Sequence, residues 1–141
     1  MSKDECSSII RRIFTLEYSM NAFDIIENSE IIKKKYGGYK RKIADCLAHR
    51  VKCNYVVLEI KTQNLWKAKV QLDDFVRRLK DLGLKINEVI VVLERVGRNR
   101  KAFEFRKTDR KGLYYLMSKG IKGSFIRAAD IPIMVYVKRG L

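Results

Sequence analysis

An acid and a base interrupt the part of this chain that most strongly favours a buried β-strand. Residues 55–61 read Tyr-Val-Val-Leu-Glu-Ile-Lys, so Glu59 and Lys61 stand among apolar and β-branched residues. Side chains two positions apart on a strand point to the same face of the sheet. Charges on a buried face are costly unless something compensates them. This face therefore either meets water at a sheet edge, the usual place for alternating charges in a strand, or carries a site that uses them.

A second acid, Asp45, lies within hairpin distance of this pair. It belongs to a strand candidate at 42–48, and a polar connection over 49–54 leads into the strand with Glu59. In a hairpin centred near Lys52, Asp45 and Glu59 are both seven residues from the centre. Directly opposed residues have Cβ atoms about 5 Å apart, close enough for two carboxylates to share one cation. A register error of one residue would place them on opposite faces, so the predicted site depends on this pairing.

The apolar spacing predicts further elements on both sides of the hairpin. Strand 55–61, then a helix, then another strand implies a crossover connection and a parallel pair within a mixed sheet. The expected elements are, in chain order, a helix from about residue 5 to the mid-twenties, strands at 30–35, 42–48 and 55–61, a helix at 66–82 with Gly83 at its C-cap, strands at 88–96 and 102–106, a helix at 112–119 and a strand at 133–138.

The charge of the chain indicates a polyanionic partner. Its 141 residues suit a single domain spanning 1–141. Lys and Arg total 31 against 16 acids, a formal net charge of +15, and such an excess attracts nucleic acid. A solubilising surface and an anionic membrane surface are the alternatives. No signal peptide or transmembrane segment is apparent, so we expect a cytoplasmic protein that does not enter a membrane.

The cysteines give no sign of a disulfide framework or a zinc site. Cys6, Cys46 and Cys53 are odd in number and lack the spacing of metal ligands. A reducing compartment is the simplest setting for them.

The pattern of Asp45, thirteen intervening residues and then Glu59-Ile60-Lys61 resembles the catalytic core of the PD-(D/E)xK nuclease superfamily. Ala44 stands where the superfamily's name places Pro. The stretch 30–96 looks most like the archaeal Holliday junction resolvases and related archaeal viral nucleases. The resemblance implies an α/β, restriction endonuclease-like core: a central mixed β-sheet flanked by helices, in the order α-β-β-β-α-β.

The residue types of this pattern suit metal-dependent hydrolysis of a phosphodiester. Asp45 and Glu59 would hold Mg²⁺, or Mn²⁺, because hard divalent cations prefer carboxylate oxygens and retain several waters. The metal activates a water and clamps the phosphoryl oxygens. Lys61 would orient that water or balance charge on the scissile phosphate. The resemblance also implies that the backbone carbonyl of Ile60 is a further ligand.

Two more side chains are candidates for the same site. The resemblance implies an additional acid on the first helix, and Glu17 is the candidate because it falls on an otherwise apolar face; a salt-bridged helix residue is the alternative reading. Glu27 and Glu30 are weaker candidates. Gln71 matches a Gln that several branches of the superfamily place near the active site, and a solvent-facing Gln is its alternative. Four other residues are expected to contact phosphate or stack on bases, unless they are ordinary loop or core residues: His49, Trp66, Tyr36 and Tyr39.

We therefore expect a metal-dependent endonuclease that hydrolyses DNA phosphodiester bonds. Branched DNA such as a Holliday junction is the leading substrate by resemblance, in recombination or repair, and its two-fold symmetry matches a C2 homodimer. Two alternatives remain: a non-catalytic nucleic-acid-binding protein on the same fold, and an exonuclease or restriction-type enzyme using the same residues.

Overall fold

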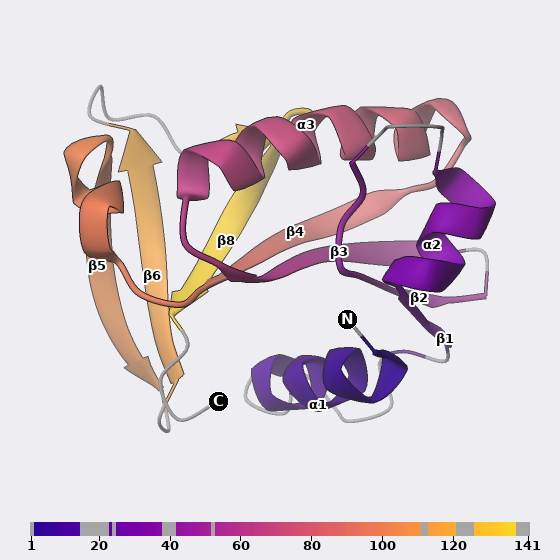
Figure 1. The fold of residues 1–141 in the computed structure, drawn as a ribbon, viewed down its shortest axis with the longest axis horizontal. Helices are drawn as coiled ribbons and strands as arrows, with labels where there is room; N and C mark the ends of the chain where they lie inside the picture. The colour runs from indigo at the N-terminus through magenta and orange to yellow at the C-terminus, as the bar shows by residue number, and fades with distance from the viewer. Residues whose placement is uncertain are drawn as a thin grey trace.

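The computed structural model describes residues 2–14, 23, 25–37, 42–51, 53–110, 113–120 and 126–137. Within these ranges the chain forms a mixed α/β fold in which a sheet is flanked by three α-helices (Figure 1). The helices are α1 (Lys3–Phe14), α2 (Ser29–Tyr36) and α3 (Leu65–Asp81), with a 3-10 helix η1 (Gly97–Lys101). The strands are β1 (Ile25–Asn28), β2 (Cys46–Arg50), β3 (Cys53–Thr62), β4 (Ile86–Leu93), β5 (Phe103–Arg110), β6 (Leu113–Gly120), β7 (Arg127–Ala128) and β8 (Ile131–Val137).

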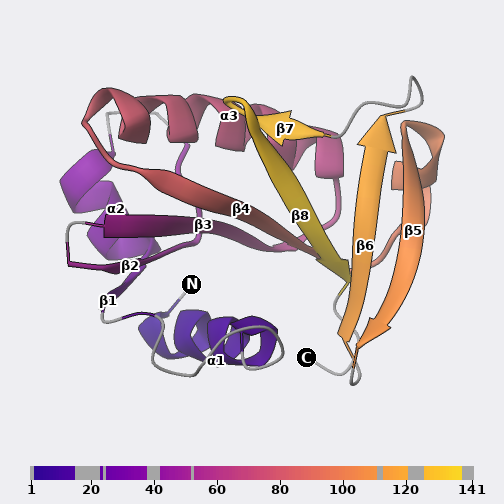
Figure 2. The ribbon, with the colours of Figure 1, turned by 180° about the vertical axis from the view of Figure 1, so that it is seen from behind.

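The sheet is mixed because its centre is parallel and its flanks are antiparallel. The strand order is β1-β2-β3-β4-β8-β6-β5, and the short β7 pairs with β8. β4 runs parallel to both β3 and β8, whereas β1, β2, β5 and β6 join through antiparallel pairs. Helix α3 connects the parallel strands β3 and β4, as the sequence predicts. Figure 2 shows the β5–β6 hairpin at the end of the sheet opposite β1.

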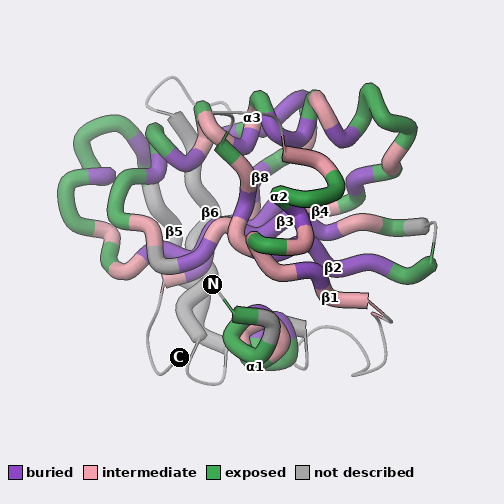
Figure 3. Tube along the Cα trace, turned by 45° about the vertical axis from the view of Figure 1, so that its right-hand side comes forward, coloured by how far each residue is buried: buried purple, intermediate pink, exposed green. Residues whose placement is uncertain are grey.

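Each face of the sheet has its own apolar core. Leu47 and Val57 face α3 and pack with residues such as Phe75. Leu58 faces the other way and packs with Ile10 of α1. Figure 1 shows α3 along one side of the sheet and α1 on the other. Figure 3 shows buried segments along the central strands, while α3 alternates between buried and exposed positions. Neighbouring residues of β2 and β3 therefore lie in different environments.

The N-terminal part differs from the prediction. Helix α1 spans Lys3–Phe14, residue 23 is not helical and β1 begins at Ile25, while residues 15–22 of the predicted helix lie outside the described residues. The predicted strand at 30–35 is wrong, because Ser29–Tyr36 is the helix α2. The Asn28 side chain accepts from the amide of Ile31 and caps this helix, and the lysines at 33–35 occupy its last turn, where they complement the helix dipole.

The central elements match the prediction closely. The strands at 55–61 and 88–96 correspond to β3 and β4, and the helix at 66–82 corresponds to α3. The strand expected at 42–48 begins later, at Cys46, and continues to Arg50. Gly83 has a φ of 87° and donates to the carbonyl of Lys80, which is the left-handed conformation that ends a helix.

One element of the C-terminal third is also wrong. β5 and β8 confirm the strands predicted at 102–106 and 133–138. The predicted helix at 112–119 is instead the strand β6. Its backbone pairs with β5 from Leu113 to Gly120 and with β8 at Tyr114 to Leu116. Pairing on both sides therefore decides the conformation of this segment.

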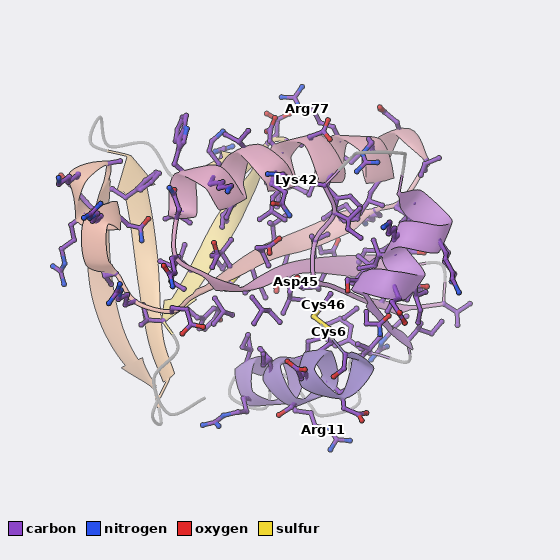
Figure 4. The ribbon with its side chains drawn as sticks, in the orientation of Figure 1. Cys6, Arg11, Lys42, Asp45, Cys46 and Arg77 are labelled. Carbon is purple, nitrogen blue, oxygen red and sulfur yellow. A yellow bond between two sulfur atoms is a disulfide. The ribbon has the colours of Figure 1, made fainter. Side chains whose placement is uncertain are left out.

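The structure contains a disulfide that the cysteine spacing does not predict. Cys6 of α1 is bonded to Cys46 of β2, with 5.8 Å between their Cα atoms. Both residues are fully buried in the core on the α1 face. The bond therefore fastens α1 to the strand that follows Asp45 (Figure 4). None of the helices described is both long enough and apolar enough to cross a membrane.

Candidate metal and active site

The β2–β3 hairpin has the register that the candidate site requires. Cys46 pairs with Leu58 and Leu47 with Val57, and Asp45, which directly precedes β2, shares a side-chain hydrogen bond with Glu59. The amide of Asp45 donates to the carbonyl of Leu58 at 3.1 Å, which holds the start of β2 against β3. The predicted register is confirmed from Cys46 to His49. Asp45 and Glu59 share the face of the sheet that α3 covers, and Cys46 points to the opposite face.

Asp45 is fixed by the backbone of the strand it faces. Its Oδ2 accepts a hydrogen bond from the amide of Ile60 at 2.9 Å. The pairing of β3 with β4 is irregular between Glu59 and Thr62, because three residues of β3 advance against two of β4. Such bulges re-aim side chains and are common next to active sites. The irregularity contains Ile60 and Lys61, two of the predicted site residues.

Gln71 of α3 links β3 to the segment that precedes β2. Its Nε2 donates to Glu59 Oε2 at 3.0 Å and to the carbonyl of Ile43 at 2.7 Å. The solvent-facing alternative for Gln71 is therefore wrong. Because one amide group holds both Glu59 and the segment leading to Asp45, Gln71 sets the orientation of the pair.

Arg78, about two turns after Gln71 on α3, was missed by sequence reasoning. Its guanidinium donates to the carbonyls of Tyr36 and Lys42 at 3.2 and 2.9 Å. Figure 4 shows Lys42 close to α3, with Asp45 nearer the sheet. In the sequence Arg78 is one of two adjacent arginines that look like ordinary surface charge. Nothing in the sequence therefore indicates that it anchors the segment before β2.

The electrostatics of the pair are unfavourable for two ionised acids. The pKa of Glu59 is raised from 4.5 to about 9, first by burial and then by the hydrogen bond and the negative charge of Asp45. Among the side chains that the structure describes, no Lys or Arg forms an ion pair with either carboxylate. Lys61 lies on β3, and its side chain is outside the description. A divalent cation between the two carboxylates would supply the missing positive charge.

The residues present fit a magnesium ion better than a metal that needs a full protein cage. No group of three or more His, Cys, Asp and Glu converges in the described part of the chain. Mg²⁺ commonly takes only one or two carboxylates and completes its shell with water and substrate phosphate. Oδ2 of Asp45 and Oε2 of Glu59 accept hydrogen bonds from Ile60 and Gln71, and a cation would replace the proton that the two carboxyl groups share in their own hydrogen bond.

The candidates for an additional acid do not join this pair. Glu17 lies outside the described residues. Glu30 is exposed on α2. Glu27 is 1% exposed on β1, but its Oε1 accepts from Lys35 Nζ and lies 3.5 Å from Nε2 of His49. The structure therefore brings together Asp45, Glu59 and Gln71 and gives Glu27 other partners.

The other predicted contact residues have varied environments. His49 is neither a loop residue nor open to phosphate, because it is 5% exposed within β2 and its ring stacks on Tyr55 at 4.4 Å. Tyr36 is half-buried and packs against the core, and burial raises the pKa of its hydroxyl. Trp66 is 58% exposed at the start of α3, so it is not a core residue. Tyr39 lies outside the described residues.

Comparison of the chain with protein-family models, with curated proteins and with solved structures finds no match. The functional conclusion therefore depends on the geometry of this site and on the charge of the chain.

Proposed function

We propose that this protein is a metal-dependent deoxyribonuclease with a PD-(D/E)xK-type site on a restriction endonuclease-like core. One observation carries the proposal: the half-buried side chains of Asp45 and Glu59 share a hydrogen bond, and Gln71 is bonded to Glu59. A stable fold gains nothing from two acids placed against each other without a cation. A divalent-metal site explains the arrangement.

Each residue has a distinct task in this proposal. Asp45 and Glu59 hold Mg²⁺ or Mn²⁺, with the Ile60 carbonyl as a further ligand. The bound cation lowers the pKa of a water and neutralises charge on the phosphoryl group. Lys61 orients the attacking water or balances the charge of the scissile phosphate. Gln71 positions Glu59, and the amide of Ile60 positions Asp45.

The proposed substrate is DNA, with four-way junctions as the leading form. A net charge of +15 favours any polyanion, so the preference for a junction comes from the resemblance of the Asp45 and Glu59-Ile60-Lys61 pattern to junction resolvases. A homodimer with two-fold symmetry would present two sites to the two-fold symmetric junction.

A non-catalytic nucleic-acid-binding protein is the second candidate, because the same basic surface serves both functions. The carboxylates favour the enzyme. A protein that only binds a phosphate backbone has no use for two acids at its centre, since they repel phosphate.

Cleavage assays with matched variants test the proposal. Purified protein is incubated with labelled linear, flapped and four-way DNA in Mg²⁺, Mn²⁺ or EDTA, beside Asp45→Asn, Glu59→Gln and Lys61→Ala. Asp81→Asn is the control, because it removes an exposed acid at the far end of α3. We expect metal-dependent cleavage that each of the three site variants reduces by about a hundredfold or more, while Asp81→Asn cuts like the wild type.

Two outcomes would contradict it. Binding without cleavage in any divalent metal would leave the non-catalytic candidate. Full activity of Asp45→Asn and Glu59→Gln, with circular dichroism showing native secondary structure, would mean that the active site lies elsewhere.

A further inference from the structure

A basic pocket lies further along the strand that carries Glu59. It has a volume of about 430 Å³ and is lined by Gln63, Arg95, Gly97 and Arg98. Gln63 follows the end of β3, and the other three residues belong to the segment that leaves β4 and enters η1. The pocket therefore opens at the carboxyl ends of two neighbouring parallel strands, where ligand sites commonly form in α/β sheets.

A buried asparagine holds the pocket's wall in place. Asn99 is 7% exposed, and its Oδ1 accepts from the amide of Leu65 at 2.8 Å. Its Nδ2 donates to the carbonyls of Gln63 and Val96 at 3.0 and 2.8 Å. One side chain thus ties η1 to the end of β3 and to the first turn of α3. This loop is pre-organised, which lowers the entropy cost of binding a ligand.

The same loop concentrates positive charge. Residues 95–101 include Arg95, Arg98, Arg100 and Lys101, and all four are exposed. None of them forms an ion pair with a carboxylate in the described part of the chain. Gly97 has a φ of 48°, and a Cβ there would lie 3.6 Å from Cγ of Arg95. The turn thus brings the Arg95 side chain back across Gly97, beside Arg98.

An exposed aromatic residue adjoins this loop. Trp66 follows Leu65, the residue whose amide binds Asn99. Its ring is 58% exposed, lies 6.5 Å from that of Phe103 and is approached by Lys69 Nζ at 5.5 Å. A tryptophan open to solvent among cations is suited to stacking on a base. Together with the pocket, it favours nucleic acid over a lipid headgroup or a free anion.

The spacing along β3 relates the pocket to the carboxylates. Gln63 lies four residues after Glu59, which corresponds to about 13 Å along a strand. Each nucleotide advances a DNA strand by about 3.4 Å. A single nucleic-acid strand can therefore reach from the carboxylates to the pocket within about four nucleotides.

We propose that Arg95 and Arg98 bind a backbone phosphate of the nucleic acid about four nucleotides from the position facing Asp45 and Glu59, with Trp66 stacked on a neighbouring base. This inference rests on the proposed function for its substrate class. Arginine suits the task because its planar fork donates two parallel hydrogen bonds to phosphate oxygens.

Binding in EDTA tests the pocket separately from cleavage. Arg95→Gln/Arg98→Gln is compared with Arg12→Gln/Arg77→Gln, in which two exposed arginines of α1 and α3 are removed, so that both variants lose two positive charges. The fluorescence of Trp66, the single tryptophan of the chain, reports stacking of the oligonucleotide. We expect the pocket variant to bind about tenfold more weakly than the control variant near 0.1 M salt. Its salt dependence should fall by about 0.9 in log-log slope, the value for one lost phosphate contact.

A scan of methylphosphonates, each of which neutralises one phosphate, then locates the contact. Wild type should lose affinity when the phosphate about four nucleotides from the cleavage position is neutral, and the pocket variant should be insensitive to that change. Equal affinity and equal salt slope in the two double variants would overturn the inference. So would binding to phosphatidylserine vesicles that needs Arg95 and Arg98 while DNA binding does not.

The two proposals fail in different ways. Pocket-dependent binding without cleavage in any metal leaves the pocket and removes the nuclease. Metal-dependent cleavage that requires Asp45, with no difference between the pocket variant and its control, leaves the nuclease and removes the pocket.

Discussion

Nε2 of Gln71 lies 3.0 Å from Oε2 of Glu59, and the same nitrogen lies 2.7 Å from the carbonyl oxygen of Ile43. A residue of α3 therefore spans the hairpin from the strand with Glu59 to the segment that precedes Asp45. Side chains that orient metal-binding carboxylates are as important to a site as the ligands they hold. In the proposed metal site, Gln71 would have this role through its hydrogen bond to Glu59.

Removing this amide should weaken metal binding and cleavage without unfolding the protein. We expect Gln71→Ala to lower Mg²⁺ affinity or the cleavage rate by about 10- to 100-fold, because Glu59 and Ile43 lose their shared donor. Val70→Ala, a neighbour on α3 that is 53% exposed, is the matched control and should behave like wild type. Metal titrations and cleavage rates measured on both variants check this, and equal values would show that Gln71 has no positioning role.

The raised pKa of Glu59 predicts how pH affects the metal-free protein. Its pKa is 4.5 in the unfolded chain and about 9 in the fold, so between these values the folded state holds a proton that the unfolded state has released. The contribution of Glu59 to stability is therefore fully present below about pH 4.5 and is lost as pH rises through about 9. Urea unfolding in EDTA should show this fall, with a slope of up to about 1.4 kcal/mol per pH unit.

Glu59→Gln separates this effect from other titrations. The amide keeps the shape of the protonated acid and cannot ionise, so the variant should lose the part of the pH slope that belongs to Glu59. A slope unchanged in Glu59→Gln would show that another group is responsible.

Magnesium binding should depend on pH in the opposite direction. The cation requires ionised Glu59, so binding releases a proton, and its affinity should increase about tenfold per pH unit up to about pH 9. Calorimetric titration in buffers of different ionisation enthalpy measures the released proton directly. An affinity that does not vary with pH would contradict Glu59 as a ligand.

The position of the candidate site was predictable from the sequence because it depends on features within one hairpin and the helix that follows it. The two-residue period of a strand and the length of one hairpin predict that Asp45 lies opposite Glu59, and the antiparallel pairing of β2 with β3 from Cys46 to His49 follows that register. The resemblance to the nuclease superfamily likewise indicates Gln71, on the helix that follows β3. These features need no knowledge of distant parts of the chain.

The errors concern features that depend on tertiary context. The segment 30–35 is a helix because Asn28 caps it, and its adjacent Ile31 and Ile32 suit a strand equally well by pattern. β6 is a strand because β5 and β8 flank it. The Cys6–Cys46 bond joins residues 40 positions apart, and an odd cysteine count conceals such a pair.

Reduction of this disulfide should destabilise the protein. In the chain-entropy description, closing a loop of 40 residues stabilises the fold by about 4 kcal/mol. Urea unfolding with and without dithiothreitol measures the difference. Cys6→Ala/Cys46→Ala serves as the control, because its stability should not respond to dithiothreitol. An equal response in wild type and the double variant would mean that the bond makes no contribution.

Asn99 should support both the fold and the pocket. Asn99→Ala leaves the amide of Leu65 and the carbonyls of Gln63 and Val96 without their partner, and unsatisfied buried groups cost about 1–3 kcal/mol. The loop that carries Arg95 and Arg98 also loses its anchor, so oligonucleotide binding in EDTA should weaken although both arginines remain. Asn87→Ala, at an exposed position of β4, is the control for both measurements. If Asn99→Ala is destabilised but binds DNA as tightly as Asn87→Ala when folded, the asparagine stabilises the fold without organising the phosphate contact.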